Sequence, residues 1–193
     1  LASIAQGARF AVNHELIRAA MLLTGVFALI VRGMLELLPP IADGVFSRGA
    51  AGLGELMAAA GAGALMAAIF LSSKGAEEAS AVPRCTLFAI FFGFGATIAL
   101  ATSPVWPLAL IATACAGFCG TMVGVSLQSV VQLNLTDERR GTVMSLWVMV
   151  GIGSASIGAI IIGGIADVIG LGPALTGASV LGAAASAWLM SAR

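Results

Sequence analysis

Residues 16–41, LIRAAMLLTGVFALIVRGMLELLPPI, decide the fold of this chain. The segment is apolar over a length sufficient to cross a lipid bilayer as one helix, which takes about 20 residues. It nevertheless contains Arg32 and Glu36, which lie four residues apart and therefore share one helical face. A charged side chain in the middle of a membrane helix costs about 2.5–3.5 kcal/mol on insertion scales, so it usually faces a bundle interior or a watery cavity. We therefore expect this face to meet a partner surface or a pathway.

The composition of the whole chain is that of a membrane protein. Of its 193 residues, 60% are hydrophobic and 9% are charged, whereas soluble domains carry about 25% charged residues. Nine basic and nine acidic residues cancel, so the charge gives no argument for a nucleic-acid partner. The three cysteines lack the spacing of a zinc site, and we expect no metal and no other cofactor. These features indicate an all-α membrane protein.

Five further apolar segments follow the first, so the sequence predicts six membrane-spanning helices. Pro39 and Pro40 are expected to end the first span, because proline disfavours a continuing helix, and a loop is expected over 42–52. Trp106, between two prolines, is expected to anchor the chain at the membrane interface. We expect an interfacial linker over 1–15 and one six-helix domain over 16–193. The predicted spans are 16–38, 53–71, 85–101, 108–131, 143–165 and 174–189.

Basic residues fall almost entirely on one side of this six-span arrangement. An even number of spans puts both chain ends on the same side, and the side rich in Lys and Arg is the cytoplasmic one. Arg48 alone falls on the opposite side, and Arg32 lies within the membrane. We therefore expect both ends to be cytoplasmic. The basic residues on the side of the chain ends are Arg9, Arg18, Lys74, Arg84, Arg139, Arg140 and Arg193.

The two triplets of spans share one plan, in which the middle span is the one rich in glycine and alanine. In the fifth span Gly151, Ala155, Ala159 and Gly163 recur every four residues and form a predicted packing ridge. Small residues let helix backbones approach closely in lipid. The plan favours two inverted three-helix repeats, from which many transporters are built. A glycine-rich helix that arises by chance in each triplet is the alternative.

Three stretches resemble the carboxy-terminal half of major facilitator superfamily transporters, most of all their bacterial drug and siderophore exporters. GARFAVNHELIRAAMLL (7–23) resembles the link into the seventh helix of that family. Residues 29–40, followed by GAAGLGELMAAAGAGALMAA (49–68), resemble its seventh and eighth helices. LNLTDERRGTVMSLWVMVGIGSASIGAIIIGGIADVIG (133–170) resembles its tenth-to-eleventh loop and eleventh helix. The chain departs from the family at Thr142, where relatives often carry Arg, and in the loop after the second span, which lacks an Asp- and Arg-rich signature.

The resemblance implies half of a transporter in the cytoplasmic membrane of a bacterium. An amino-terminal six-helix half of the same protein would be its partner, and a small-molecule substrate would bind between the halves. The implied activity is secondary active export of a small amphipathic molecule by alternating access, not an enzymatic reaction. No phosphate-binding loop for ATP follows a soluble strand, so a gradient, for example of protons, would drive transport. A six-helix membrane scaffold without transport activity is the alternative.

Four residues are candidates for the substrate or proton pathway. We expect Arg32 and Glu36 to line the central cavity, with Glu36 as the proton-sensitive group and Arg32 as its counter-charge. A structural pair that neutralises itself against a neighbouring helix is the alternative. Gln128 and Gln132, four residues apart at the end of the fourth span, are expected to line the cytoplasmic vestibule. A helix end that meets water would explain both glutamines equally well.

A charged cluster after the fourth span is a candidate cytoplasmic gate. It consists of Asp137, Arg139, Arg140 and Gly141, in a segment that we expect to be a loop. In a gate, the arginines would bind helix ends or carboxylates of the other half. The alternative is a solvated loop that only anchors the topology.

Overall fold

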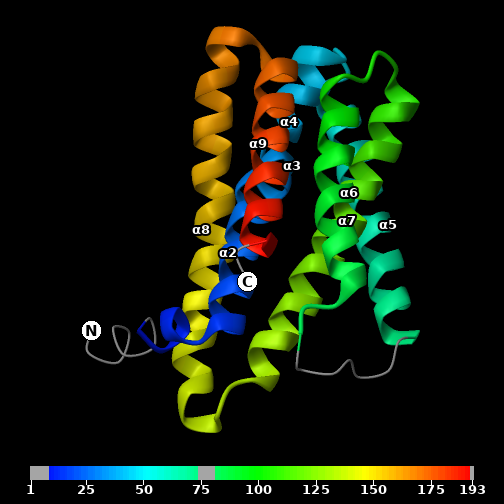
Figure 1. The fold of residues 1–193 in the computed structure, drawn as a ribbon. Helices are drawn as coiled ribbons and strands as arrows, with labels where there is room; N and C mark the ends of the chain where they lie inside the picture. The colour runs from blue at the N-terminus through cyan, green and yellow to red at the C-terminus, as the bar shows by residue number, and fades with distance from the viewer. Residues whose placement is uncertain (1–8, 74–80, 192–193) are drawn as a thin grey trace.

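Six long helices form the molecule, as the sequence predicts (Figure 1). The computed structural model describes residues 9–73 and 81–191. Within these ranges the first span combines α2 (Glu15–Phe27), the π-helical turn η1 (Ala28–Arg32) and α3 (Gly33–Glu36). All six spans are long and apolar enough to cross a membrane. The other five are α5 (Gly49–Ser73), α6 (Arg84–Ala101), α7 (Trp106–Leu133), α8 (Asp137–Ile169) and α9 (Leu171–Ser191).

Successive long helices run in opposite directions, so the molecule has two distinct ends (Figure 1). We call the lower one in this view the terminal end, because α2 begins there and α9 runs toward it. The other, the turn end, carries the connections that follow the first span, α6 and α8. Residues 9–13 of the expected linker are helical, whereas its residues 1–8 lie outside the described part of the chain. Lys74 and Arg193 also lie outside it, so their positions stay predictions.

The boundary between the first two spans differs from the prediction. The first membrane-length helix ends at Glu36, before the two prolines. Pro39 and Pro40 lie inside a short helical turn, α4 (Leu38–Pro40), because proline is tolerated in the first turn of a helix, where its missing N–H would have no partner. The π-helical turn η2 (Ile41–Val45) follows, and α5 begins at Gly49. The segment expected to be a loop is therefore largely helical.

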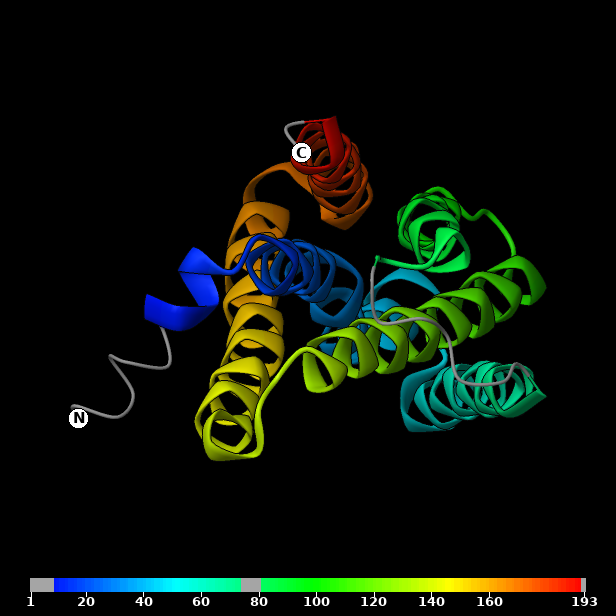
Figure 2. The same cartoon turned by 60° about the horizontal axis from the view of Figure 1, so that its bottom comes forward.

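The long helices pack in two groups of three. In one group α5 packs chiefly against α7, which also packs against α6; in the other, α8 packs against the first span and against α9. The packing of α6 against α9 connects the two groups. The view in Figure 2 shows α5 beside α7 and α8 beside the first span. The second span thus packs against the fourth, and the fifth against the first. The middle helix of each triplet therefore packs against the first helix of the other triplet. This reciprocal packing relates the two triplets to each other in the same way, as expected of two inverted three-helix repeats.

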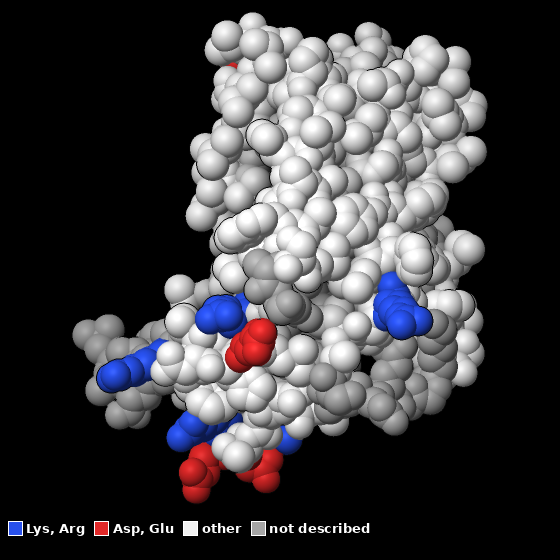
Figure 3. Space-filling model, viewed as in Figure 1, with Lys and Arg blue, Asp and Glu red and all other residues white. Residues whose placement is uncertain are grey.

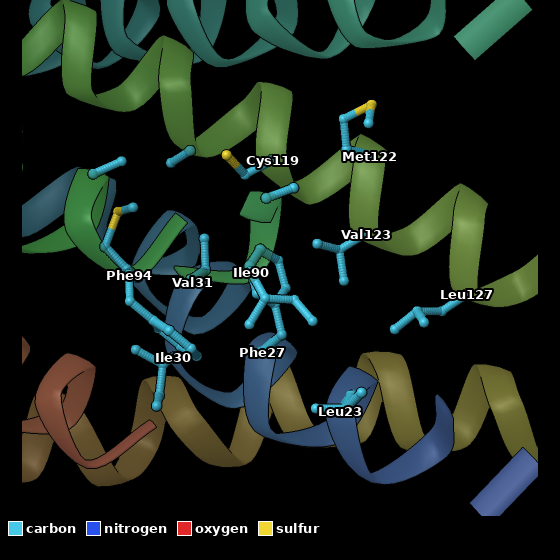
Figure 4. Close-up of a cluster of buried hydrophobic side chains, with 14 of the residues drawn as sticks. Leu23, Phe27, Ile30, Val31, Ile90, Phe94, Cys119, Met122, Val123 and Leu127 are labelled. Carbon is cyan, nitrogen blue, oxygen red and sulfur yellow. The ribbon is translucent and has the colours of Figure 1, made fainter. Parts of the chain in front are cut away.

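An apolar core joins the two groups where the first span meets α6 and α7 (Figure 4). Leu23, Phe27 and Ile30 of the first span belong to it, together with Phe94 of α6 and Val123 of α7. The ring centroids of Phe27 and Phe94 lie 5.9 Å apart, a favourable separation for an aromatic pair. The core holds the first span between its neighbours and leaves Arg32 and Glu36 on its exposed side.

Close backbone contacts hold α8 against the first span. A Cβ atom on Gly158 would overlap the carbonyl oxygen of Leu29. A Cβ atom on Gly33 would lie 3.1 Å from both the carbonyl oxygen of Ala155 and the amide nitrogen of Ala159. Two members of the predicted packing ridge therefore lie at this contact. The closest approach occurs at Gly158, which the four-residue period of the ridge does not include.

The ends of the predicted ridge lie at looser places. Gly151 is buried, but no atom lies within 4 Å of a Cβ built on it. A Cβ on Gly163 would meet Leu37 Cδ2 at 3.6 Å, an ordinary van der Waals distance. The period of small residues thus identifies the packed face of α8 but not the residue of closest contact.

The same kind of contact holds α5 against α7. A Cβ on Gly63 would overlap the carbonyl oxygen of Ala114, and a Cβ on Gly117 would overlap that of Ala60. Backbones can approach this closely only where both surfaces lack side-chain bulk. Each of the two groups therefore has one pair of helices in direct backbone contact.

Candidate functional site

An open cavity of about 450 Å³ lies between the first span, α5 and α7. This volume is within the range of small-molecule sites in proteins, roughly 300–1,000 Å³. Arg32 enters it from the first span, and Thr121 and Gln128 add polar groups from α7. The rest of the wall consists of small or aliphatic side chains. These residues are Leu35, Ala60, Gly61, Ala64, Gly117, Gly120, Gly124 and Val125.

The cavity lies about midway along the membrane-length helices. Ala60 is about the middle residue of the 25-residue helix α5, roughly 16 Å from its start at 1.5 Å per residue. From this level the cavity follows α7 toward Gln128, in the direction of the terminal end. A molecule in the cavity would therefore lie about midway along α5 and reach toward the terminal end.

Arg32 is an exposed cation in this cavity. Among the described residues, the ion pairs are Arg48 with Glu55 and Arg140 with Asp137, so Arg32 has no acidic partner there. The expected ion pair between Arg32 and Glu36 is absent from these residues, although both side chains are exposed. Their pathway role stays a prediction.

The structure brings only part of the predicted pathway to this cavity. Arg32 and Gln128 line it together, whereas Glu36 and Gln132 do not. Glu36 lies one turn further toward the turn end, and half-buried Gln132 lies one turn closer to the terminal end. The four predicted residues are therefore arranged along the line from the turn end to the terminal end. Glu36 lies on one side of the cavity and Gln132 on the other.

The π-helical turn η1 determines where Arg32 lies. In α7, the residues that meet the glycine and alanine of α5 are Ala114 and Gly117, three positions apart. In the first span the residues that meet α8 in the same way are Leu29 and Gly33, four positions apart. A π-helical turn inserts one residue into a helix, and η1 ends at Arg32, immediately before Gly33. No composition signal in the sequence indicates this turn.

The candidate gate lies on a helix and not in the expected loop. Because α8 begins at Asp137, all four predicted gate residues belong to its first turns, and only residues 134–136 connect it to α7. Acidic side chains are favourable in a first helical turn, where the helix dipole is positive. Arg140 Nη1 lies 3.2 Å from Asp137 Oδ1, and both side chains, like Arg139 and Gly141, are exposed.

Arg139 contacts the short helix that precedes the first span. Its Cζ lies 4.5 Å from the ring centroid of Phe10, within the range of a cation–π interaction. The Phe10 ring lies 5.8 Å from the ring of His14. Sequence reasoning missed this contact because residues so far apart in the chain share no periodic pattern. It ties the predicted linker to the start of α8.

A second polar cluster lies at the turn end. Trp106 Nε1 donates a hydrogen bond of 2.7 Å to Glu55 Oε2, and Arg48 Nη1 lies 3.8 Å from the same oxygen. Arg48 Cζ also lies 4.6 Å from the Trp106 ring centroid. Trp106 is only 8% exposed, so it is not the interfacial anchor that its flanking prolines indicate. It connects the start of α7 to α5.

Within residues 9–73 and 81–191, no group of three or more His, Cys, Asp or Glu side chains is placed to hold a metal ion. The search of curated proteins and the search of solved structures gave no match. The scan of protein families matched residues 1–193 to a model described as "Transmembrane secretion effector". The chain therefore belongs to this transmembrane secretion effector family of major facilitator superfamily transporters.

Proposed function

We propose that this chain is the carboxy-terminal half of a secondary active exporter that works by alternating access. Family membership supports membrane transport in general. The observation that carries the proposal is Arg32, an exposed cation that lacks an ion pair among the described residues and lines a cavity midway along α5. A charge at this depth is costly unless it faces water, a substrate or a charged partner, and a transport pathway supplies such surroundings.

The second half would cover the exposed side of the first span. Arg32 and Glu36 both lie on that side, and substrate would bind between the two halves. Gln128 would extend the polar wall toward the terminal end, and Gln132 would continue it. The small side chains of α5 and α7 leave the space that an amphipathic organic molecule needs.

Alternating access requires each half to move as one body. The backbone contacts of Gly158 with Leu29 and of Gly63 with Ala114 support such a body, because packed interfaces resist continuous deformation. The core around Phe27 joins the two helix groups within the half. The movement would then occur against the second half, on the face that carries the cavity.

The terminal end would face the bacterial cytoplasm. On the face shown in Figure 3, charged side chains gather toward that end, and most of the remaining surface carries none. Arg139 and Arg140, together with Asp137 and Gly141, would belong to the cytoplasmic gate. Because Arg140 pairs with Asp137 and Arg139 with the ring of Phe10, closure of the gate would exchange these contacts for contacts with the second half.

We further propose that Glu36 couples transport to protons, because a carboxylate in the pathway can gain and lose a proton during the cycle. The test uses the full-length protein in proteoliposomes and a panel of fluorescent amphipathic compounds. Glu36→Gln is expected to abolish acceleration by a pH gradient while downhill flux continues. Asp167→Asn, which removes an exposed carboxylate near the end of α8, is the control and should behave like the wild type. An unchanged rate and pH dependence in Glu36→Gln would contradict the coupling role.

A further inference from the structure

We propose that the cavity binds an anionic group of the transported molecule at Arg32, so that the substrates are amphipathic organic acids. The inference rests on the proposed transport function and names the chemical class of its substrate. It is carried by three observations: the origin of the Arg32 position, the absence of a competing anion among the described residues, and the lining of the cavity.

The repeat shows that Arg32 is an inserted residue. Leu29 in the first span and Ala114 in α7 present their carbonyl oxygens to equivalent glycines of the partner helices. Gly33 and Gly117 are likewise equivalent, because each faces the carbonyl oxygen of an alanine on the partner helix. In both partner helices this alanine lies three residues before the glycine that meets Leu29 or Ala114. Leu29 and Gly33 are four positions apart, whereas Ala114 and Gly117 are three positions apart. The π-helical turn η1 accounts for the additional residue in the first span.

Burial identifies Arg32 as the residue without a counterpart in α7. If Leu29 corresponds to Ala114, then Val31 corresponds to Ala116, and both are fully buried. The next equivalent residues are the buried glycines Gly33 and Gly117. Arg32 therefore stands alone between two matched positions, on the outside of the turn. Since π-helical turns are frequent at functional sites, an inserted residue that places a cation in a cavity points to ligand binding.

The described part of the chain offers Arg32 no anion of its own. None of the residues that line the cavity is acidic. Glu55 accepts the hydrogen bond of Trp106 beside Arg48, and Asp137 pairs with Arg140. Glu36 lies outside the cavity lining. The guanidinium group is thus available for an anion that arrives from outside the described chain.

The lining matches a molecule with one anionic group and an apolar body. A guanidinium offers five N–H donors in a planar fork that fits a carboxylate with two parallel hydrogen bonds. The hydroxyl of Thr121 and the amide of Gln128 lie in the same wall. Gly61 of α5 and Gly120 and Gly124 of α7 have no atom within 4 Å of a built Cβ, so the space beside them is open.

The test measures binding of acids and of their uncharged amides to the purified full-length protein. The probes are benzoate, 2-naphthylacetate and 1-pyrenebutyrate, each paired with its primary amide, and the readouts are thermal stabilisation and calorimetric titration. A ligand that binds only the folded protein raises its Tm. We expect at least one acid to bind about tenfold more tightly than its amide, and Arg32→Gln to remove that preference. A tenfold change corresponds to about 1.4 kcal/mol.

Variants of the cavity separate a binding role from a structural one. Arg32→Lys keeps the charge but loses the planar fork, so it should retain part of the preference for acids. Gly124→Val should fill the cavity and weaken binding of acid and amide alike. Gly95→Val is the matched control, because Gly95 is exposed on α6, away from the cavity, and also has open space at its Cβ; it should bind like the wild type.

Three results would overturn the inference. In the first, no acid is preferred over its amide; in the second, Arg32→Gln leaves the preference unchanged. In the third, Arg32→Gln lowers the Tm without any probe while acids and amides bind equally, which would assign the guanidinium to a carboxylate of the second half. Flux of neutral compounds in the same protein would leave the proposed transport function intact in each case. Conversely, an acid preference without any flux would contradict the transport function alone.

Discussion

Two glycines of this chain are required by packing and not by backbone conformation. Gly158 and Gly63 lie in the middle of helices, where glycine costs roughly 1 kcal/mol relative to alanine. A Cβ at either position would overlap a carbonyl oxygen of the facing helix. The close approach of the helices is therefore the reason for glycine at both positions.

Gly158→Ala is expected to destabilise the protein by about 1–3 kcal/mol, because a core that is already close-packed must shift to admit the methyl group. Gly153→Ala in the same helix is the control, since no atom lies within 4 Å of its built Cβ, and alanine there is expected to be neutral or slightly stabilising. Thermal unfolding followed with a thiol-reactive dye suits this chain, because Cys119 is a free, fully buried thiol. Equal melting temperatures for the two variants would contradict the close contact.

Trp106 tests the polar cluster at the turn end. Trp106→Phe keeps an aromatic ring and removes the donor of the 2.7 Å hydrogen bond to Glu55. Hydrogen bonds to charged groups contribute about 1.5–3 kcal/mol, and the side chain of Glu55 is 49% exposed, so we expect a loss of about 1 kcal/mol. Trp188→Phe on α9, where the side chain is exposed, should leave the Tm unchanged. A similar Tm for both variants would show that the hydrogen bond adds nothing to stability.

At the scale of the helices, the sequence predicted existence and order better than ends. Six long apolar segments are sufficient to identify six spans, because the bilayer sets their minimum length. The ends were harder to predict because helices continue beyond the apolar stretch. Polar residues from Asp137 to Gly141 extend α8, and Pro39 and Pro40 fit into a first turn. The π-helical turn η1 was not predictable at all, because the extra residue shows only when the contacts of the first span with α8 are compared with those of α7 with α5.

The inserted residue leads to a prediction about the first span. Deletion of Arg32 is expected to convert η1 into regular α-helix and to keep Leu29 and Gly33 against α8, as Ala114 and Gly117 are kept against α5. The variant should therefore fold, with loss of the binding preference for acids. The measurement is the yield and Tm of monodisperse protein in size-exclusion chromatography.

Deletion of Met21 is the control for this experiment. Met21 lies in regular α-helix, where removal of one residue rotates everything before it by about 100° relative to the rest, at 3.6 residues per turn. Buried Ile17 and Ala20 would then leave the core, so we expect little folded protein. If both deletions fold equally well, or neither does, Arg32 is not the inserted residue.

At the scale of the whole molecule, the sequence located charges but not the space between them. Arg32 and Gln128 were identified because polar groups are rare in apolar spans. The walls of the cavity were not identified, because nothing in the sequence distinguishes Gly61 and Gly120 from the many other small residues. Only the pairing of α5 with α7, a long-range property, distinguishes glycines that face open space from glycines in contact.

The orientation in the membrane is a further prediction at this scale. The terminal end is expected to face the cytoplasm, because arginines at the starts of α2, α6 and α8 lie there, and the rule for basic residues favours this side. In a cysteine-free background, Ser191→Cys and Asn13→Cys should react with a membrane-impermeant thiol reagent only after the cells are permeabilised. Asp43→Cys, at an exposed position of the turn end, should react in intact cells. Leu181→Cys, exposed in the middle of α9, should react under neither condition, because its side chain would face lipid. Labelling of Ser191→Cys in intact cells, with Asp43→Cys protected, would indicate the opposite orientation. Labelling of Ser191→Cys and Asp43→Cys from the same side would contradict the six-span topology itself.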